Sequence, residues 1–226
     1  MFNKIKTKSA FTLAEVLITL VIIGVVAALT ISAVINTYVE RSTISKVKKG
    51  LSTIAQAKKL AEAQNGSIIG WNFGEGATAQ TAADFWKYIK PHISVAKDCG
   101  SGTDCYQSDG IKKINGYSYS NNFNALSKYY KFILSDGSVM WFRTGGAGDQ
   151  GKCSTSYESG VENICAVFFY DINGIKQPNT LGRDIFGYIV TLNGVYPNNY
   201  DSCNTNSTGI GCTAYIMTKG NMNYLH

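Results

Sequence analysis

An unbroken run of apolar side chains dominates the beginning of the chain. Residues 16–35, VLITLVIIGVVAALTISAVI, carry no charge, and the run extends back to Phe11 with Glu15 as its only charged residue. A helix of this length would measure about 37 Å, more than the roughly 30 Å hydrocarbon core of a bilayer. The pattern predicts a transmembrane helix over residues 11–35. A buried core helix is the competing interpretation.

The helical pattern continues beyond this run but becomes amphipathic over residues 36–65, the predicted stem. Four apolar residues recur at i, i+3, i+7 and i+10, namely Ile44, Val47, Leu51 and Ile54. The pattern favours a seam against the protein's own sheet over a partner site. The lysines off this stripe are expected to face solvent: Lys46, Lys48, Lys49, Lys58 and Lys59. Asn65-Gly66 is a typical helix stop, so one helix is predicted over residues 11–64.

The remainder, residues 66–226, is expected to form an extracytoplasmic head. A short helix is predicted over residues 82–89, ended by Pro91. Segments 129–135 and 138–143 flank Asp136-Gly137, a hairpin signal. Further strands are predicted at 164–170, 184–192 and 213–218, which are rich in β-branched and aromatic residues. The expected fold class is α+β, with a long N-terminal helix packed on an antiparallel sheet.

Charge and motifs exclude several classes of protein. The net charge of +6 includes Lys4, Lys6 and Lys8, and without them the balance is 18 − 15 = +3. Nucleic acid is therefore an unlikely partner. Two histidines leave little material for a His-based zinc or catalytic site. Phosphate-loop, dinucleotide, zinc-protease and serine-hydrolase motifs are missing from the sequence, so the chain is predicted not to be an enzyme.

The six cysteines all follow residue 98 and fall into three local couples. Six cysteines allow 15 connectivities, and the nearest-neighbour pairing is predicted, with other pairings left open: Cys99–Cys105, Cys153–Cys165 and Cys203–Cys212. An even number of cysteines in polar loops indicates disulfides and an oxidising compartment.

One loop could hold a hard cation. Asp171 and Asn173 begin a segment that returns through Pro178-Asn179 to Asp184, and oxygen side chains at alternate positions can point at one Ca²⁺ ion. The loop lacks the carboxylate density of a tight calcium site. The competing interpretation is a plain Asn-Gly turn, with Asp184 starting a strand.

Residues 10–20, AFTLAEVLITL, resemble the class III signal of type IV pilins and type II secretion pseudopilins. The resemblance implies that a prepilin peptidase removes the basic leader, residues 1–10, between Ala10 and Phe11, and that the new amino group of Phe11 is methylated. It also implies that Glu15 is the assembly residue. The sequence departs from the usual pattern at Ala10, where most relatives have Gly.

This resemblance implies a structural subunit of a type IV pilus or a type II secretion pseudopilus. Its partners would be the peptidase, other pilin subunits and the inner membrane, which it would cross once with the head outside the cytoplasm. Two alternatives stay open. A DNA-binding uptake pilin would need a basic, aromatic-lined groove on the head, and a signal-anchored surface enzyme would need titratable residues clustered in a deep pocket.

Overall fold

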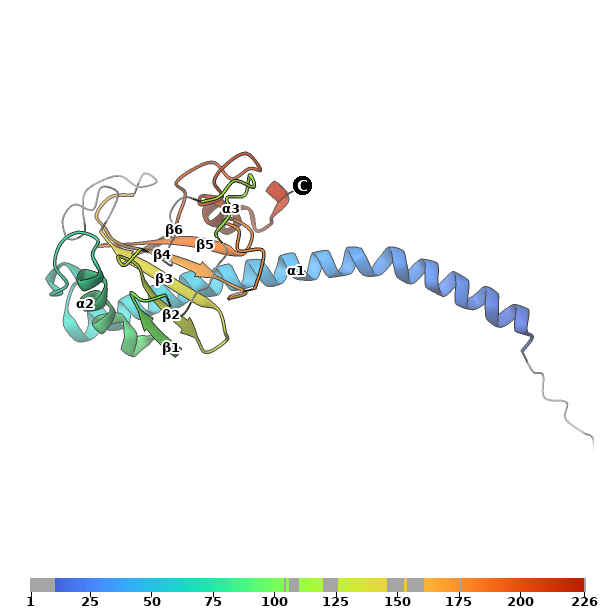
Figure 1. Cartoon of the computed structure of the whole chain (residues 1–226), viewed down its shortest axis with the longest axis horizontal. Helices are drawn as coiled ribbons and strands as arrows, with labels where there is room; N and C mark the ends of the chain where they lie inside the picture. The colour runs from blue at the N-terminus through green and yellow to red at the C-terminus, as the bar shows by residue number, and fades with distance from the viewer. Residues whose placement is uncertain are drawn as a thin grey trace, which may run out of the picture. The chain divides into compact units, whose positions relative to one another are not determined.

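The structure is a computed structural model that describes residues 11–103, 105, 110–119, 126–145, 153, 161–174 and 176–225. The chain divides into two compact units, Met1–Arg41 and Ser42–His226. It contains a long N-terminal helix and a six-stranded antiparallel sheet (Figure 1). This α+β arrangement confirms the predicted fold class.

Helix α1 (Leu13–Asn65) accounts for the long N-terminal pattern. By length and composition it can cross a membrane, and the large apolar side chains described before residue 36 are exposed. The helix ends where the sequence predicts, because Gly66 takes a left-handed φ of 76° and its N–H donates to the carbonyl oxygen of Glu62 at 2.9 Å.

The sheet in the second unit is an antiparallel meander whose strands pair in chain order. The strands are β1 (Val95–Gly100), β2 (Tyr130–Leu134), β3 (Val139–Thr144), β4 (Ile164–Asp171), β5 (Ile185–Thr191) and β6 (Val195–Pro197). The turn between β2 and β3 lies at Asp136-Gly137, with Gly137 at a φ of 83°. The predicted hairpin is therefore confirmed, as are strands β4 and β5.

Both faces of the central strands are buried, and every residue of β3, β4 and β5 is buried. One face packs against α1 and α2 through Phe142, Phe168 and Tyr188. The other carries Trp141, whose ring stacks on that of Phe169 at 5.9 Å. Two-sided burial explains why these strands read as continuous apolar runs rather than alternating ones.

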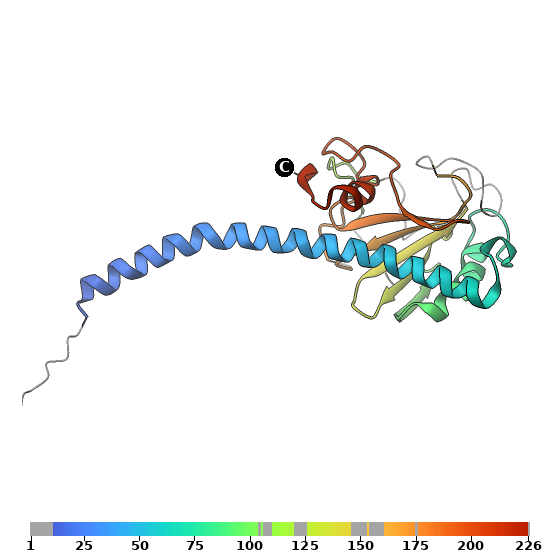
Figure 2. The same cartoon turned by 180° about the vertical axis from the view of Figure 1, so that it is seen from behind.

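Within the second unit, α1 lies across one face of the sheet (Figure 2). The buried stripe of the helix consists mostly of small residues: Thr43, Val47, Gly50, Ile54, Ala57 and Ala61. At Gly50 the helix and the sheet approach each other closely, since an added Cβ would lie 2.6 Å from the hydroxyl oxygen of Tyr188 and 2.7 Å from Cδ1 of Tyr170. Tyr188 donates a hydrogen bond to the carbonyl oxygen of Val47 at 2.7 Å. Small helix residues thus make room for large aromatic residues of the sheet.

The expectation that the stem lysines face solvent is wrong for Lys58. Its side chain is buried, with Nζ 2.7 Å from the carboxylate of Glu62 and 3.1 Å from the carbonyl oxygen of Leu192. Lys46 is exposed but donates to the carbonyl oxygen of Ile172, and Lys49 pairs with Asp136. A periodic pattern places these lysines off the apolar stripe but cannot show that loop carbonyls and carboxylates lie within their reach.

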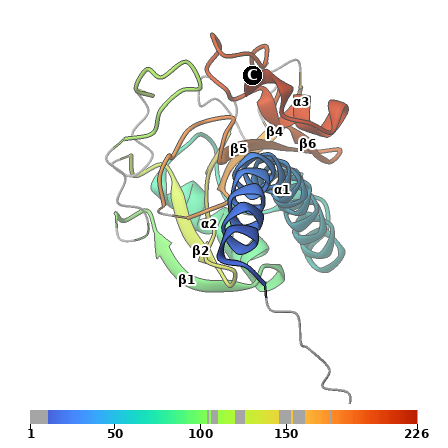
Figure 3. The same ribbon diagram turned by 90° about the vertical axis from the view of Figure 1, so that its right-hand side faces the viewer.

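Two further helices complete the head. Helix α2 (Ala79–Ile89) begins three residues earlier than predicted, because Thr78 and Thr81 form a capping box. Helix α3 (Cys212–Lys219) lies beside β5 and β6 (Figure 3). Single 3₁₀ turns occupy Ile68–Gly70, Lys90–His92 and Asn223–Leu225.

The predicted strand at residues 213–218 is wrong, because this segment belongs to α3. Its β-branched and aromatic residues favour a strand, but Cys212, Thr213 and Ile216 are buried on one side of a helix. The helix ends at Gly220, which takes a left-handed φ of 69°. Tertiary packing here outweighs local propensity.

The sequence prediction also missed strands β1 and β6 at the two edges of the sheet. β1 is largely exposed and irregular, with two register shifts against β2, and β6 has three residues and ends in Pro197. Neither segment has the apolar alternation on which strand prediction depends.

Candidate functional site

The N-terminus of α1 forms a capping box between Thr12 and Glu15. The backbone N–H and the hydroxyl of Thr12 both donate to Oε2 of Glu15, at 2.9 and 2.8 Å. The backbone N–H of Glu15 donates in return to the hydroxyl oxygen of Thr12 at 3.2 Å. Such a reciprocal pair satisfies backbone donors at a helix start. It also fixes the direction of the Glu15 side chain.

This geometry leaves one carboxylate oxygen of Glu15 available. All of the hydrogen bonds to its side chain go to Oε2, and Oε1 has no partner within the described residues. Phe11 stands next to it with 87% of its surface exposed, while Ala10 lies outside the described residues. A carboxylate with one free oxygen can accept an ammonium group supplied from outside the chain.

Thr12 is the residue of this site that sequence reasoning missed. The signal was present, because Thr-x-x-Glu directly before an apolar run is the pattern of a capping box. The sequence interpretation treated Glu15 as an isolated charge, and the structure shows it held in place by its neighbour.

The three disulfides lie in the second unit and join cysteines that are close in sequence. The bonds are Cys99–Cys105, Cys153–Cys165 and Cys203–Cys212. All six cysteines of the chain are used. Each bond closes a loop at the border of the sheet or of α3, so the bonds restrain loops and leave the helix–sheet contact non-covalent.

The candidate calcium loop is organised by hydrogen bonds to Asp184. Its carboxylate accepts the backbone N–H groups of Asn179, at 2.8 Å, and Thr180, and the side-chain amide of Asn173 at 3.1 Å. Burial raises the pKa of Asp184 above its ordinary value, against the opposing effect of these donors. Asp171 is buried as well and accepts the N–H of Asn173 at 3.1 Å. The loop therefore brings together the predicted residues Asp171, Asn173 and Asp184.

The carboxylate and the amide atoms in this loop differ in their hydrogen bonding. N–H donors from Asn173, Asn179 and Thr180 surround the Asp184 carboxylate. By contrast, Oδ1 of Asn173 and both polar atoms of the Asn179 side chain are buried and have no hydrogen-bond partner among the residues that the structure describes. No group of three or more His, Cys, Asp and Glu side chains that could hold a metal occurs in the described part of the chain.

The same loop connects three segments of the head. The backbone N–H of Lys112 donates to the carbonyl oxygen of Asn179, and that of Leu181 donates back to Lys112. The hydroxyl of Tyr224 donates to the carbonyl oxygen of Gly182 at 2.6 Å. Asp184 thus fixes the turn on which the C-terminal segment and the segment around Lys112 both dock.

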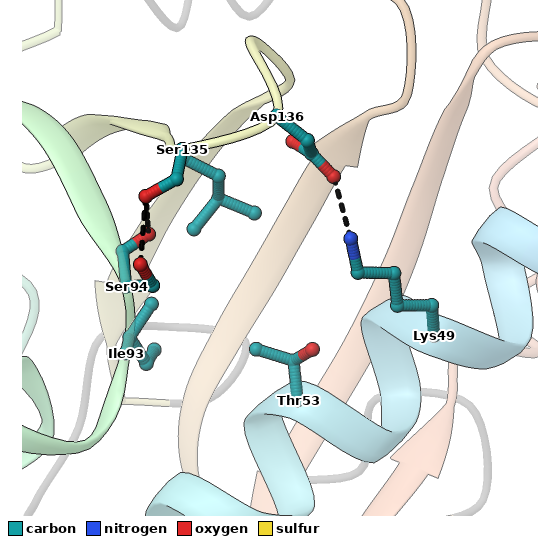
Figure 4. Close-up of a pocket in the computed structure, with 7 residues that line it drawn as sticks. Lys49, Thr53, Ile93, Ser94, Ser135 and Asp136 are labelled. Carbon is teal, nitrogen blue, oxygen red and sulfur yellow. Dashed lines mark hydrogen bonds and ion pairs between the residues drawn. The ribbon is translucent and has the colours of Figure 1, made fainter.

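A groove of about 310 Å³ lies between α1 and the hairpin of β2 and β3 (Figure 4). Lys49 and Asp136 form an ion pair of 2.7 Å across its mouth, and the hydroxyls of Ser94 and Ser135 are 2.7 Å apart. Partial burial opposes ionisation of Asp136, but hydrogen bonds from Lys49 and Ser138 outweigh it and lower its pKa to about 2. These groups satisfy one another, so the groove carries no nucleophile paired with a base.

Comparison with known proteins gives one match, at the N-terminus. Residues 5–31 match the prokaryotic N-terminal methylation motif. No curated protein and no solved structure matches the chain. The matched segment contains Ala10, Phe11, Thr12 and Glu15 together with most of the apolar run. Residues 5–31 are therefore the class III signal of type IV pilins and pseudopilins.

Proposed function

We propose that this chain is a pilin-like or pseudopilin-like structural subunit, cut by a prepilin peptidase between Ala10 and Phe11 and polymerised into a type IV pilus or a type II secretion pseudopilus. The observation that carries this function is the Glu15 carboxylate, the only charge in an otherwise apolar segment, held by Thr12 with one oxygen free.

The energetics of Glu15 favour a partner in another subunit. A carboxylate at mid-bilayer costs roughly 2.5–3.5 kcal/mol on insertion scales, and among packed apolar helices it would again lack water. It therefore needs a cation. Cleavage at Phe11 creates one, the new α-ammonium, and a neighbouring subunit can present this group to Oε1 of Glu15. Such a pair fixes the axial register of an incoming subunit.

Location and processing are part of this proposal. The leader, residues 1–10, would stay in the cytoplasm, residues 11–35 would cross the inner membrane, and the stem and head would lie outside. Disulfides in the second unit support an oxidising location for it. N-terminal sequencing of membrane-extracted protein should begin at Phe11. A start after Ala28, where Val26-Ala27-Ala28 resembles an ordinary signal-peptide cleavage site, or an intact Met1, would contradict the proposed processing.

The assembly role is tested by two substitutions at Glu15. Glu15→Gln keeps an acceptor for Thr12, since glutamine also completes a capping box, but removes the charge. Glu15→Val removes both. We expect normal insertion and leader cleavage for both variants and little of either in filaments sheared from cells and blotted.

The outcomes separate ion pairing from helix capping. If Glu15 only caps the helix, Glu15→Gln should assemble at wild-type levels, and that result would refute the ion pair. Thr30→Val is a matched control, because Thr30 is also polar within the apolar run but its hydroxyl bonds only to the helix's own backbone, with 2.9 Å to the carbonyl oxygen of Val26. This control should assemble normally.

A second proposal is calcium binding by Asp171, Asn173 and Asp184. It is supported by the buried Oδ1 atoms of Asn173 and Asn179, which have no partner within the described part of the chain, since amide oxygens are ligands that Ca²⁺ accepts. Titration calorimetry of the full chain in detergent should give saturable heat with CaCl₂ that Asp184→Asn abolishes and Asp201→Asn keeps. No heat at millimolar calcium, together with an unchanged melting temperature, would leave only the hydrogen-bonded turn.

A further inference from the structure

A second groove lies at the end of α1 that is furthest from Ser42, where the helix meets α2. Asn65, Asn72, Gln80, Asp84, Lys87 and Tyr88 line most of it. Helix α1 contributes Asn65 to its lining, and α2 contributes Gln80, Asp84, Lys87 and Tyr88. Its volume of about 510 Å³ falls in the range of small-molecule sites, roughly 300–1,000 Å³.

The walls of this groove are built on ordered elements. Gln80, Asp84 and Tyr88 are four residues apart along α2 and therefore stand on one face of that helix. Thr81, beneath them, is fixed by a hydrogen bond of 2.7 Å to the hydroxyl of Thr144 in β3. A preformed wall of this kind lowers the entropy lost when a ligand binds.

The opposite wall is tied to α2 through aromatic residues. The backbone N–H of Asn72 donates to the hydroxyl oxygen of Tyr88 at 2.9 Å. The ring of Tyr88 stacks on Trp71, with ring centroids 4.8 Å apart and an interplanar angle of 9°. Trp71 is itself anchored by a hydrogen bond of 2.8 Å from its indole to the carbonyl oxygen of Gly66. The ring of Tyr88 is thus a rigid part of the groove.

The charges in the groove cancel. Lys87 Nζ lies 2.7 Å from Oδ1 of Asp84, and the amide of Gln80 donates to Oδ2 at 2.8 Å. Hydrogen bonds from Lys87 and Gln80 lower the pKa of Asp84, so this carboxylate stays ionised at neutral pH. A charged ligand would meet no unpaired opposite charge here. The pair instead offers a donor and an acceptor to a neutral one.

Amide groups supply the remaining hydrogen-bonding capacity. The side-chain amide of Asn72, Oδ1 of Asn65 and Oε1 of Gln80 have no partner among the described residues. Each amide offers both donors and acceptors in a fixed plane. These three groups surround a groove with an aromatic wall and no net charge.

We propose that this groove binds a neutral oligosaccharide. Each sugar ring combines hydroxyls that both donate and accept hydrogen bonds with an apolar C–H face that can lie against the Tyr88 ring. The amides and the Asp84–Lys87 pair meet the hydroxyls. This site does not depend on the assembly role of Glu15, because all of its residues belong to the second unit.

The test uses the full chain in micelles of a phosphocholine detergent, because a maltoside or glucoside headgroup would compete for the groove. Saturation-transfer NMR is recorded with three probes, N,N′-diacetylchitobiose, lactose and maltotriose. At least one probe should give saturable, millimolar binding that changes little with salt. The double variant Asn72→Ala/Gln80→Ala should weaken it about tenfold, since each neutral hydrogen bond contributes a few-fold.

The matched control is Asn193→Ala, an exposed amide that lines a separate hollow beside Thr191 and Tyr196, and it should bind as wild type. Unchanged melting temperatures establish that the variants are folded. Saturable binding that the double variant retains in full would overturn the proposal, as would no saturable signal from any of the three probes. Both results can be obtained whether or not the chain assembles into filaments.

Discussion

The two parts of α1 meet different surroundings with different residues. The part before residue 36 exposes large aliphatic side chains on all described sides and includes one charge, Glu15. The part from residue 42 to Asn65 buries a narrow stripe of small residues and exposes polar ones. In the first part the partners must come from outside the chain. In the second part, aromatic residues of the sheet fill the space beside the small residues of the helix.

This difference means that the same substitution should act differently in the two parts. A change in the first part should alter insertion or assembly and leave the folding of the head intact. A change in the second should alter the stability of the head. All three tryptophans, Trp71, Trp86 and Trp141, are buried in the second unit, so tryptophan fluorescence of the full chain in detergent reports on the head alone.

The largest effect is expected for Gly50→Ala. The new methyl group would lie 2.6 Å from the hydroxyl oxygen of Tyr188 and would disturb its hydrogen bond to Val47. Overpacking and a buried hydroxyl that loses its partner should together cost about 2–4 kcal/mol, against a gain of under 1 kcal/mol in helix propensity. The measurement is urea unfolding followed by tryptophan fluorescence.

Gly24→Ala is the matched control in the first part of the helix. An added Cβ there has no heavy atom within 4 Å, so the stability of the head should be unchanged. An equal loss of stability for both variants would contradict the separation of the two parts.

Asp184→Asn should have the next largest effect, about 1–3 kcal/mol of destabilisation, because two backbone N–H groups lose a charged acceptor in a buried loop. The C-terminal segment should loosen first, since Tyr224 docks on this loop. Hydrogen exchange of the amides of α3 and the following turn measures this directly. Glu75→Gln, which removes an exposed charge on the same unit, should leave the exchange rates unchanged.

Thr12→Val should cost about 1 kcal/mol of capping at the start of α1 and release the Glu15 side chain. We expect filament yield to fall part of the way toward that of Glu15→Val, with unchanged head stability. Thr12→Ser keeps the hydroxyl and should restore the yield. Equal yields for the valine and serine variants would show that the capping box does not position Glu15.

The smallest effect is expected for Lys49→Met, because exposed ion pairs contribute about 0–1 kcal/mol. Its signature is pH dependence. Asp136 has a folded pKa of about 2 against an ordinary 3.8, so its contribution is present above pH 3.8 and disappears as the pH falls toward 2. Acid titration of the unfolding free energy should show a smaller loss in this window for the variant than for the wild type.

Sequence patterns predicted the elements whose signals are local. The structure has the long N-terminal helix, its end at Asn65-Gly66 and the turn at Asp136-Gly137 where the sequence predicts them. Each of these features depends on residues that are neighbours along the chain. The strand prediction for residues 213–218 was wrong, because packing around Ile216 outweighs the strand propensity of this segment. The exposed edge strand β1 carries no apolar alternation and could not be found in this way.

The candidate sites also differ in whether nearby residues in the sequence mark them. Glu15 is conspicuous in sequence as a charge in an apolar run, and Thr12 could have been found from its spacing to Glu15. Gly50 could not, because a glycine inside a helix reads only as a weak helix former until Tyr188 is seen to occupy the space beside it. The groove beside α2 also depends on residues from distant segments, so no single motif marks it.

The placement of the disulfides has a mechanical consequence. None of the three bonds crosses from α1 to the sheet. Among the described residues, side-chain packing, the Tyr188 hydrogen bond and lysine contacts to the sheet loops therefore resist a pull along the helix axis. The three covalent bonds should remain intact under a load that separates the helix from the sheet. Under tension, the contact between α1 and the sheet is therefore expected to separate before the disulfide-bonded loops.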